Sequence, residues 1–141
     1  MRLSFKSIIA SLLLLCSVTH AEQLEKLGPW DVHYIVIPST FITPEISKAY
    51  GLQRSKYKAL INISVLDSQS KEAQSVVVSG TAKNLLGQIR QLDFQEVKEQ
   101  QSIYYLAQFT IDDDELWRFD ITVRHGNDSQ KLMFKQKVYA E

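Results

Sequence analysis

Four consecutive acidic residues, from Asp112 to Glu115, are the densest cluster of possible metal ligands in the chain. Hard cations such as calcium prefer clustered carboxylates, so a metal-binding loop is one interpretation. The spacing does not match an EF-hand, however, and the cluster leads directly into a strand-like run at Trp117. Acidic turns commonly end strands and discourage edge pairing, which is the role that we favour. The sequence therefore predicts neither a metal site nor a cofactor.

Catalysis by a histidine base would depend on His33 or His125. His33 lies inside a predicted strand and His125 lies at a predicted hairpin, so the two are poorly placed to share a site. The chain also has no Gly-x-Ser-x-Gly elbow, phosphate-binding glycine loop, His-Glu-x-x-His or Cys-x-x-Cys motif. We predict no catalytic residue, and an enzyme whose site is assembled from scattered residues is the alternative.

Basic residues gather in two places. Arg54, Lys56 and Lys58 alternate before an apolar run, which predicts that they point outward at the start of a strand. They would suit a carboxylate, a phosphate or an acidic partner, and the simpler interpretation is a solvated strand start. Because exposed charges contribute little to stability, replacing Arg54 and Lys58 with alanine should leave melting nearly unchanged.

The second basic group lies in the last predicted strand, where three lysines share one side with Met133 and Tyr139: Lys131, Lys135 and Lys137. This row could contact a ligand. Lysine along an edge strand is also common protection against aggregation, and we favour that role.

A short helix is predicted just before the first basic group. Thr43 can cap it, Pro44 and Glu45 suit its first turn, and Gly51 can end it in a left-handed conformation. Its apolar residues share one face: Ile46, Ala49 and Tyr50. Two turns are too few to persist alone, so this face should dock on the rest of the fold. The helix and the basic segment together form the candidate interaction surface: Thr43, Glu45, Tyr50, Arg54, Lys56 and Lys58.

These elements must be positioned by strands, since most of the chain alternates between apolar and polar residues. About seven strands are predicted: 29–37, 57–67, 74–82, 88–97, 102–111, 115–125 and 130–140. This spacing is typical of a single antiparallel β-sandwich, and an immunoglobulin-like, all-β fold with the short helix between its first two strands is our prediction. The alternative is a lipocalin-type or other small barrel, which usually needs at least eight strands.

The first 21 residues are predicted to be a signal peptide. Arg2 and Lys6 precede an apolar stretch that is too short to span a bilayer, and a small residue, Ala21, ends the segment. Cleavage there would leave residues 22–141 as one domain without cysteine, because Cys16 is the sole cysteine. Lipidation of Cys16 is the alternative, but Leu15 stands where lipoprotein signals carry a small residue.

Charge and composition exclude several classes of protein. The chain has 16 basic and 16 acidic residues, and removal of Arg2 and Lys6 leaves 14 against 16, a net charge near −2. A balanced surface gives no overall attraction to nucleic acid or anionic lipid. With 45% hydrophobic residues, the chain is not of a disordered class.

The segment "STFITPEISKAYGLQRSKYKALINISVLD", with the preceding "DVHYIVIP", resembles the family catalogued as domain of unknown function 4426. The family consists of uncharacterised bacterial exported proteins. The resemblance implies a signal peptide, a periplasmic location and an all-β domain. It implies no activity, substrate or catalytic residue.

The combined expectation is a non-enzymatic periplasmic interaction module. Its partner would be a periplasmic protein or a small anionic ligand, bound through the short helix and the basic segment, and the mature form would have no membrane span. A structural or assembly protein of the envelope is the other alternative to an enzyme.

Overall fold

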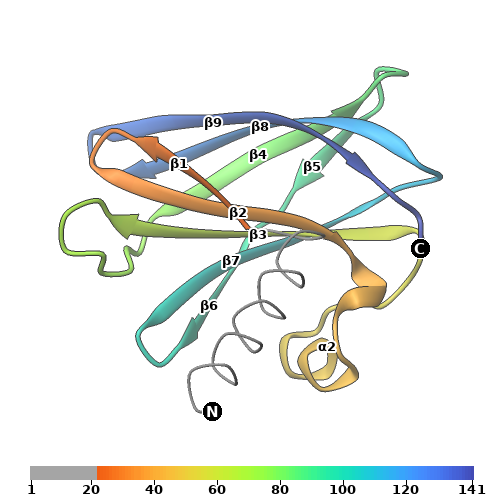
Figure 1. The fold of residues 1–141 in the computed structure, drawn as a ribbon, viewed down its shortest axis with the longest axis horizontal. Coiled ribbons are helices and arrows are strands. Elements are labelled where there is room, and N and C mark those ends of the chain that lie inside the picture. The colour runs from red at the N-terminus through yellow and green to blue at the C-terminus, as the bar shows by residue number, and fades with distance from the viewer. Residues whose placement is uncertain (1–21) are drawn as a thin grey trace, which may run out of the picture.

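The computed structural model describes residues 22–141, so the predicted signal peptide lies outside the described residues. Figure 1 shows the described part as two layers of strands with one short α-helix. The elements in chain order are β1 (Gln23–Leu27), β2 (Trp30–Pro38), the 3-10 helix η1 (Ser39–Phe41), α2 (Pro44–Tyr50), β3 (Lys58–Asp67), β4 (Val77–Asn84), β5 (Ile89–Leu92), β6 (Gln95–Glu99), β7 (Ser102–Thr110), β8 (Glu115–His125) and β9 (Asp128–Val138). Neither helix of this part is long and apolar enough to cross a membrane.

All strand pairs are antiparallel and form two sheets. Sheet A has the order β1-β2-β3-β7-β6, and sheet B has the order β5-β4-β8-β9. Without β1, these are the A-B-E-D and C′-C-F-G sheets of an immunoglobulin-like sandwich, in the same chain order. The predicted fold class is confirmed, and the two separate sheets exclude the closed alternative.

The core lies between the sheets because alternate residues of each strand point inward. In β8 the inward residues Trp117, Phe119, Ile121 and Val123 are fully buried, as the alternation predicts. Phe109 of sheet A meets Trp117 and Phe119 of sheet B edge-to-face, with ring centroids 5.3 and 5.6 Å apart. These aromatic contacts hold the two layers together.

The prediction of about seven strands is too low, for two reasons. The predicted polar lead contains β1, an edge strand with no buried residue, so its sequence does not alternate clearly. The predicted strand 88–97 is two strands in different sheets, because the chain leaves sheet B after Leu92 and enters sheet A at Gln95. Leu92 and Phe94 both pack on the core, which explains why the run reads as one strand.

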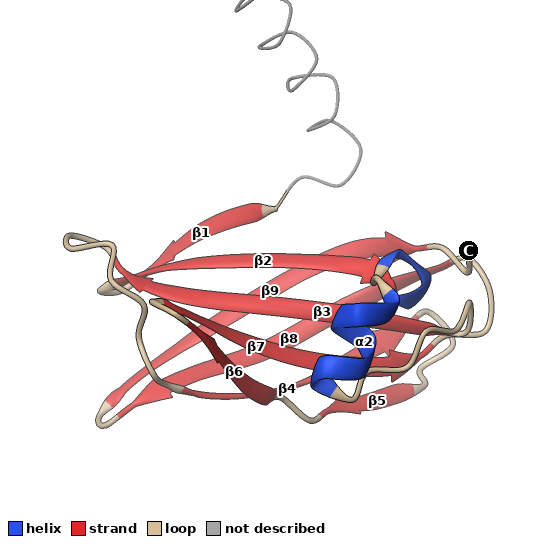
Figure 2. Ribbon diagram, turned by 90° about the horizontal axis from the view of Figure 1, so that it is seen from below, coloured by secondary structure: helices blue, strands red, loops and turns tan. Residues whose placement is uncertain are grey.

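The helix α2 lies over the outer face of sheet A (Figure 2). Beneath it is a second, smaller apolar cluster with Ile42, Leu60, Val97 and Leu106 as its buried residues. Of the predicted docking face, only Tyr50 packs on this cluster, since Ile46 is 46% exposed and Ala49 is also exposed. The docking contact is made instead by the flanking residues Ile42 and Leu52, so that part of the prediction is wrong.

Candidate functional site

The predicted capping of α2 is present. Thr43 Oγ1 accepts a hydrogen bond of 3.3 Å from Ile46 N–H, and Gly51 ends the helix with φ 66°. Glu45 lies exposed in the first turn. Tyr50 donates its hydroxyl proton to Glu99 Oε1 of β6, and this hydrogen bond raises the pKa of the Tyr50 hydroxyl. Thr43 and Tyr50 therefore hold the helix in place.

The prediction that the basic residues alternate along a strand is wrong for Arg54 and Lys56. The strand β3 begins only at Lys58. Before it, the buried Ser39 side chain donates to Ser55 O (2.6 Å) and accepts from Ser55 N–H (2.9 Å), and Lys58 N–H closes a turn on Ser55 O. These bonds hold residues 54–57 in an irregular connection.

The Arg54 guanidinium donates two hydrogen bonds within this connection. Its Nε donates to Ile42 O at 2.6 Å, and its Nη2 donates to Thr40 O at 3.3 Å. Lys56 lies over the ring of Tyr57, 5.1 Å from the centroid. The structure therefore gives the Arg54 guanidinium a structural partner, and the three cations do not form one row.

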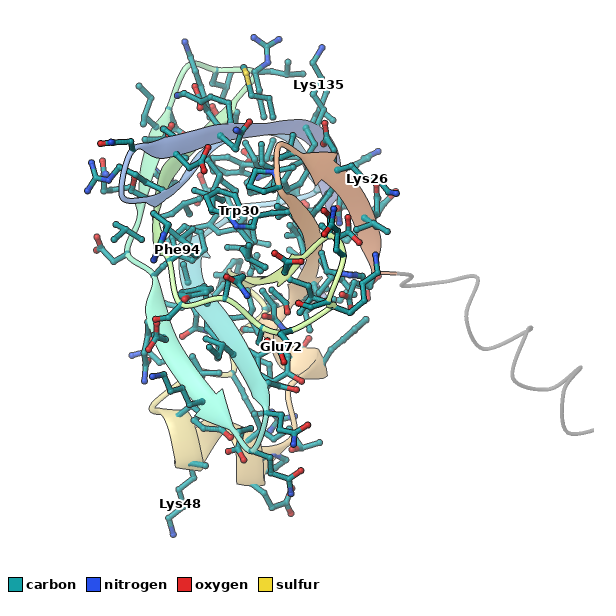
Figure 3. The ribbon with its side chains drawn as sticks, turned by 90° about the vertical axis from the view of Figure 1, so that its left-hand side faces the viewer. Lys26, Trp30, Lys48, Glu72, Phe94 and Lys135 are labelled. Carbon is teal, nitrogen blue, oxygen red and sulfur yellow. The ribbon has the colours of Figure 1, made fainter. Side chains whose placement is uncertain are left out.

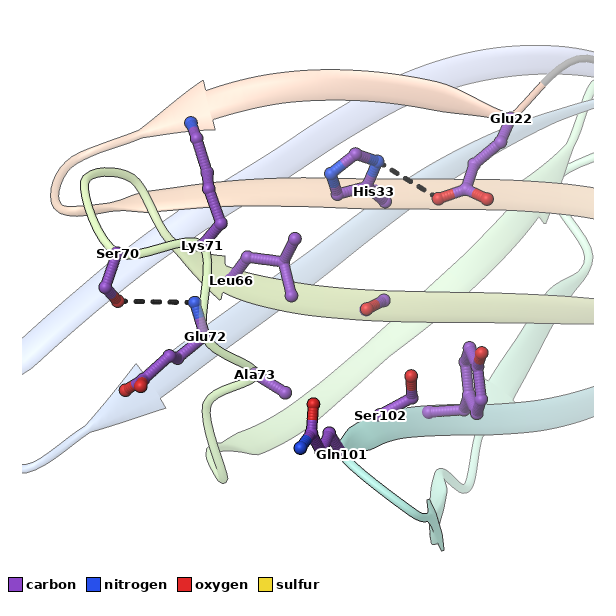
Figure 4. Close-up of a pocket in the computed structure, with 11 residues that line it drawn as sticks. Glu22, His33, Leu66, Ser70, Lys71, Glu72, Ala73, Gln101 and Ser102 are labelled. Atoms are coloured by element: carbon purple, nitrogen blue, oxygen red, sulfur yellow. Dashed lines mark hydrogen bonds and ion pairs between the residues drawn. The ribbon is translucent and has the colours of Figure 1, made fainter.

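A different feature of sheet A has the shape of a binding site. A depression of about 820 Å³ lies on its outer face, beside the region that α2 covers. Figure 4 shows that side chains from several segments of the chain line it. The lining residues are Glu22, His33, Ser64, Leu66, Ser70, Lys71, Glu72, Ala73, Gln101, Ser102 and Tyr104. We refer to it below as the sheet A depression.

One wall of the depression is the loop of residues 67–76. Asp67 Oδ1 accepts hydrogen bonds of 2.9 Å from the backbone N–H groups of Gln69 and Ser70. The hydrogen bond from Ser70, followed by that from Gln69, is the main cause of a lowered pKa of the Asp67 carboxyl. The backbone bonds from Gln74 N–H to Val65 O (2.8 Å) and from Asp67 N–H to Glu72 O (2.9 Å) close the loop on the end of β3.

An ion pair between a buried carboxylate and an exposed lysine attaches the middle of this loop to β2. Lys71 Nζ lies 2.6 Å from Asp31 Oδ2, and the Asp31 side chain is only 4% exposed. The hydrogen bond from Lys71 is the main cause of a lowered pKa at Asp31, and burial opposes it. Asp31 Oδ1 has no hydrogen-bond partner within residues 22–141.

Tyr105 attaches the end of the loop. Its hydroxyl accepts from Val76 N–H (2.8 Å) and lies 3.0 Å from Glu96 Oε2 and 3.3 Å from Gln74 O. Hydrogen bonds from Ser75 and Tyr105 lower the pKa of Glu96, whereas burial raises the pKa of Tyr105. Carboxylates thus hold both ends and the middle of the loop, which makes this wall of the depression preorganised.

The opposite wall contains a histidine beside a carboxylate. His33 Nδ1 lies 3.1 Å from Glu22 Oε1 (Figure 4). Ser64 is the direct neighbour of His33 across the β2–β3 pair. Within residues 22–141, no serine hydroxyl donates a hydrogen bond to His33. A serine nucleophile needs such a contact with its base, so the arrangement is not a catalytic triad.

The acidic cluster and the histidines do not form a metal centre in the described part of the chain. No group of three or more His, Cys, Asp or Glu side chains among residues 22–141 could hold a metal ion. Asp114 Oδ1 instead accepts from Ala140 N–H at 3.1 Å, which ties the acidic turn to the end of the chain.

Sequence reasoning missed the depression because its residues come from several separate segments of the chain. His33 and Ser64 can be recognised as neighbours only after the register of β2 and β3 is known. Asn62 Oδ1 is buried without a partner within residues 22–141, on the same face as Ser64. Asn62 does not line the depression, however, and its buried oxygen is closed to a ligand on the surface.

A family model described as "Domain of unknown function (DUF4426)" matches residues 24–141. The crystal structure of a DUF4426 family protein from Pseudomonas aeruginosa PAO1 is similar at 36% identity and a TM-score of 0.74, over 84% of this chain and 94% of that chain. Comparison with proteins of curated function gives no match.

Two structures of FetP from uropathogenic Escherichia coli strain F11 share the fold at 10% identity. One is FetP as isolated after recombinant expression in the periplasm, with a TM-score of 0.59 over 84% of this chain and 93% of that chain. The other is a copper-bound variant, also with a TM-score of 0.59, over 84% of this chain and 90% of that chain. At this identity the similarity concerns the fold alone.

Proposed function

Because the chain belongs to the DUF4426 family, whose function is unknown, we propose a function from geometry: a non-enzymatic binding module that takes its ligand in the sheet A depression. The observation that carries this proposal is the loop of residues 67–76, held by Asp67, Asp31 and Glu96. A preorganised wall lowers the entropic cost of binding. The helix α2 adjoins the depression, since Tyr50 and the lining residue Tyr104 pack on the same apolar cluster, whereas the basic segment does not line it.

The ligand that suits the depression is an extended segment of another exported protein. The lining side chains carry both charges together with hydroxyls and an amide, and Leu66, Ala73 and Tyr104 add apolar surface. A polypeptide offers donors, acceptors and side chains to such a mixed surface. A small anion would need unpaired cations, but Lys71 already pairs with Asp31 and His33 with Glu22. The protein partner is therefore preferred over the small anionic ligand.

Export to the periplasm is part of the proposal. The apolar segment before residue 22 supports it, and FetP, which shares the fold, was expressed in the periplasm. Copper binding is not proposed for this chain, since residues 22–141 hold no group of three His, Cys, Asp or Glu side chains that could bind a metal ion and the identity to FetP is 10%.

Site-specific photo-crosslinking in living cells tests the proposal with matched pairs of positions. A photoreactive residue at Ser70 or Gln101, which line the depression from two different segments, should give one protein adduct common to both. The same residue at Ser79 or Gln91, which are equally exposed but lie on the outer face of sheet B, should not give that adduct. Identical adducts from all four positions, or no adduct from the first two, would reject the depression as the site.

A further inference from the structure

The outer face of sheet B, on the opposite side of the sandwich, carries a row of cations. In register across three neighbouring strands, Lys83 of β4 lies opposite Arg118 of β8, which lies opposite Lys135 of β9. All three side chains are exposed. Figure 3 shows Lys135 pointing away from the molecule, far from Lys48 of α2.

This row has no acidic partner in the described part of the chain. Asp120, in the adjacent row, is paired with Lys131 at 2.9 Å. None of the ion pairs within residues 22–141 includes Lys83, Arg118 or Lys135. Like charges directly opposite one another destabilise a sheet, and a bound anion would remove that cost.

Two leucines project beside the cation row, at the tip of the β4–β5 hairpin. Leu85 is 80% exposed and Leu86 is 81% exposed. The tip extends beyond the body of the sandwich (Figure 1). It is nevertheless firmly built, because the Asn84 and Gln88 side chains bond to one another (2.8 Å), and Gln88 N–H donates to Asn84 Oδ1 (2.9 Å).

Leu85 and the three cations line the same hollow. A hollow of about 200 Å³ is lined by the three cations together with Asn84, Leu85 and Leu116. Such a hollow can hold a phosphate group beside the start of an apolar chain, which is the chemistry of a phospholipid. Leu85 also borders a second hollow of about 410 Å³, which includes Lys137 but also Asp114 and Glu115.

We propose that this face is a peripheral docking surface for a membrane of anionic phospholipid. Leu85 and Leu86 enter the boundary between headgroups and acyl chains, while Lys83, Arg118 and Lys135 contact lipid phosphates. A fluid lipid layer is preferred over an acidic protein because the leucines stand on a convex tip, which a protein could bury only with a matching pocket. The nearly balanced net charge predicted no attraction to anionic lipid. The net charge of the whole chain does not show, however, that cations gather on the outer face of sheet B.

The surface is distinct from the sheet A depression, so both can be used at once. A protein docked through sheet B on a membrane would present the depression to the aqueous side. The docking proposal does not depend on the proposed function, and each can fail without the other.

Vesicle flotation tests the docking proposal on protein purified from cells that express the full chain. Vesicles of phosphatidylcholine with an equal part of phosphatidylglycerol should bind the protein, and added salt should release it. Vesicles of pure phosphatidylcholine should bind it much more weakly. The double variants Leu85→Ser/Leu86→Ser and Lys83→Glu/Lys135→Glu should each weaken binding by more than about tenfold, since each removes two anchoring groups.

Two control variants carry the same chemical changes elsewhere. Ile46→Ser replaces an apolar residue that is 46% exposed, and Lys48→Glu/Lys56→Glu reverses two exposed cations near α2. Both controls should bind vesicles as the unaltered protein does. Equal losses in control and test variants would overturn the proposal, because they would reflect net charge or exposed apolar area in general.

A fluorescent reporter separates insertion from surface adsorption. Trp30 and Trp117 are buried, so a Leu86→Trp variant adds the one tryptophan at the tip. Its emission should shift to shorter wavelength on anionic vesicles and be quenched by brominated acyl chains. No binding of the unaltered protein to anionic vesicles, or binding without quenching, would overturn the proposal, and an acidic protein would then be the occupant to test.

Discussion

Asp31 is a buried carboxylate next to the sheet A depression. It joins β2 to the loop of residues 67–76 through its ion pair with Lys71, whose own side chain is exposed. The hydrogen bond from Lys71 lowers the pKa of Asp31 below its ordinary value of 3.8. Hydrogen bonds to Asp67 and Glu96 lower their pKa values too, from 3.8 and 4.5.

These shifts predict how stability depends on pH. A carboxylate whose pKa is lower in the folded state contributes stability that is fully present above its unfolded pKa, and that is lost as pH falls through its folded pKa. The free energy of unfolding in urea should therefore fall as pH is lowered below about 4. Asp31→Asn should make this fall shallower, because one of the titrating groups is gone. An unchanged slope in Asp31→Asn would contradict the assigned role of the Lys71 contact.

Tyr105 is the second residue that fixes the loop. Tyr105→Phe removes the acceptor of the buried Val76 N–H and the partner of Glu96. We expect a loss of about 1–3 kcal/mol in the free energy of unfolding, the usual cost of leaving a buried donor unsatisfied. Tyr57→Phe, at a ring that is 50% exposed, is the matched control and should change stability by less than about 0.5 kcal/mol. Equal values for the two variants would show that the Tyr105 hydroxyl does not fasten the loop.

At the scale of elements, the connection from η1 to β3 has a structural role that its sequence conceals. Arg54 donates to the carbonyls of Ile42 and Thr40, so the expectation that its loss leaves melting unchanged no longer applies. Arg54→Ala should cost about 1 kcal/mol, from the loss of hydrogen bonds to a charged donor. Lys56→Ala, in the same connection, should change stability by less than about 0.5 kcal/mol. Thermal melting of the two variants checks this difference, and coincident curves would contradict it.

The elements that the sequence predicted well are those with strong local signals. The capped helix ends at Gly51, and the alternation in β8 matches its buried face. The edge strand β1 and the step from β5 to β6 were missed because neither leaves a local signal. The strand β1 has no buried residue. Between β5 and β6 the chain changes sheets, but Leu92 and Phe94 both pack on the core, so the apolar pattern continues without a break.

At the scale of the whole molecule, the sandwich separates two surfaces of different chemistry. The outer face of sheet A holds the polar depression, and the outer face of sheet B holds the cation row. Neither could be predicted from the sequence, because each depends on cross-strand register between segments far apart in the chain. The sequence shows the three lysines of β9, but Lys83 and Arg118 join Lys135 only through the pairing of β4, β8 and β9.

The measurement that tests the central proposal most directly is crosslinking from Gln101 after the depression has been filled. Ser64→Trp places a large side chain at its floor, and Thr122→Trp makes the same kind of change on the outer face of sheet B. Both variants should melt close to the unaltered protein, since both positions are partly exposed. We predict that the protein adduct from Gln101 disappears in Ser64→Trp and persists in Thr122→Trp. An adduct that persists in a folded Ser64→Trp variant would contradict binding in the depression.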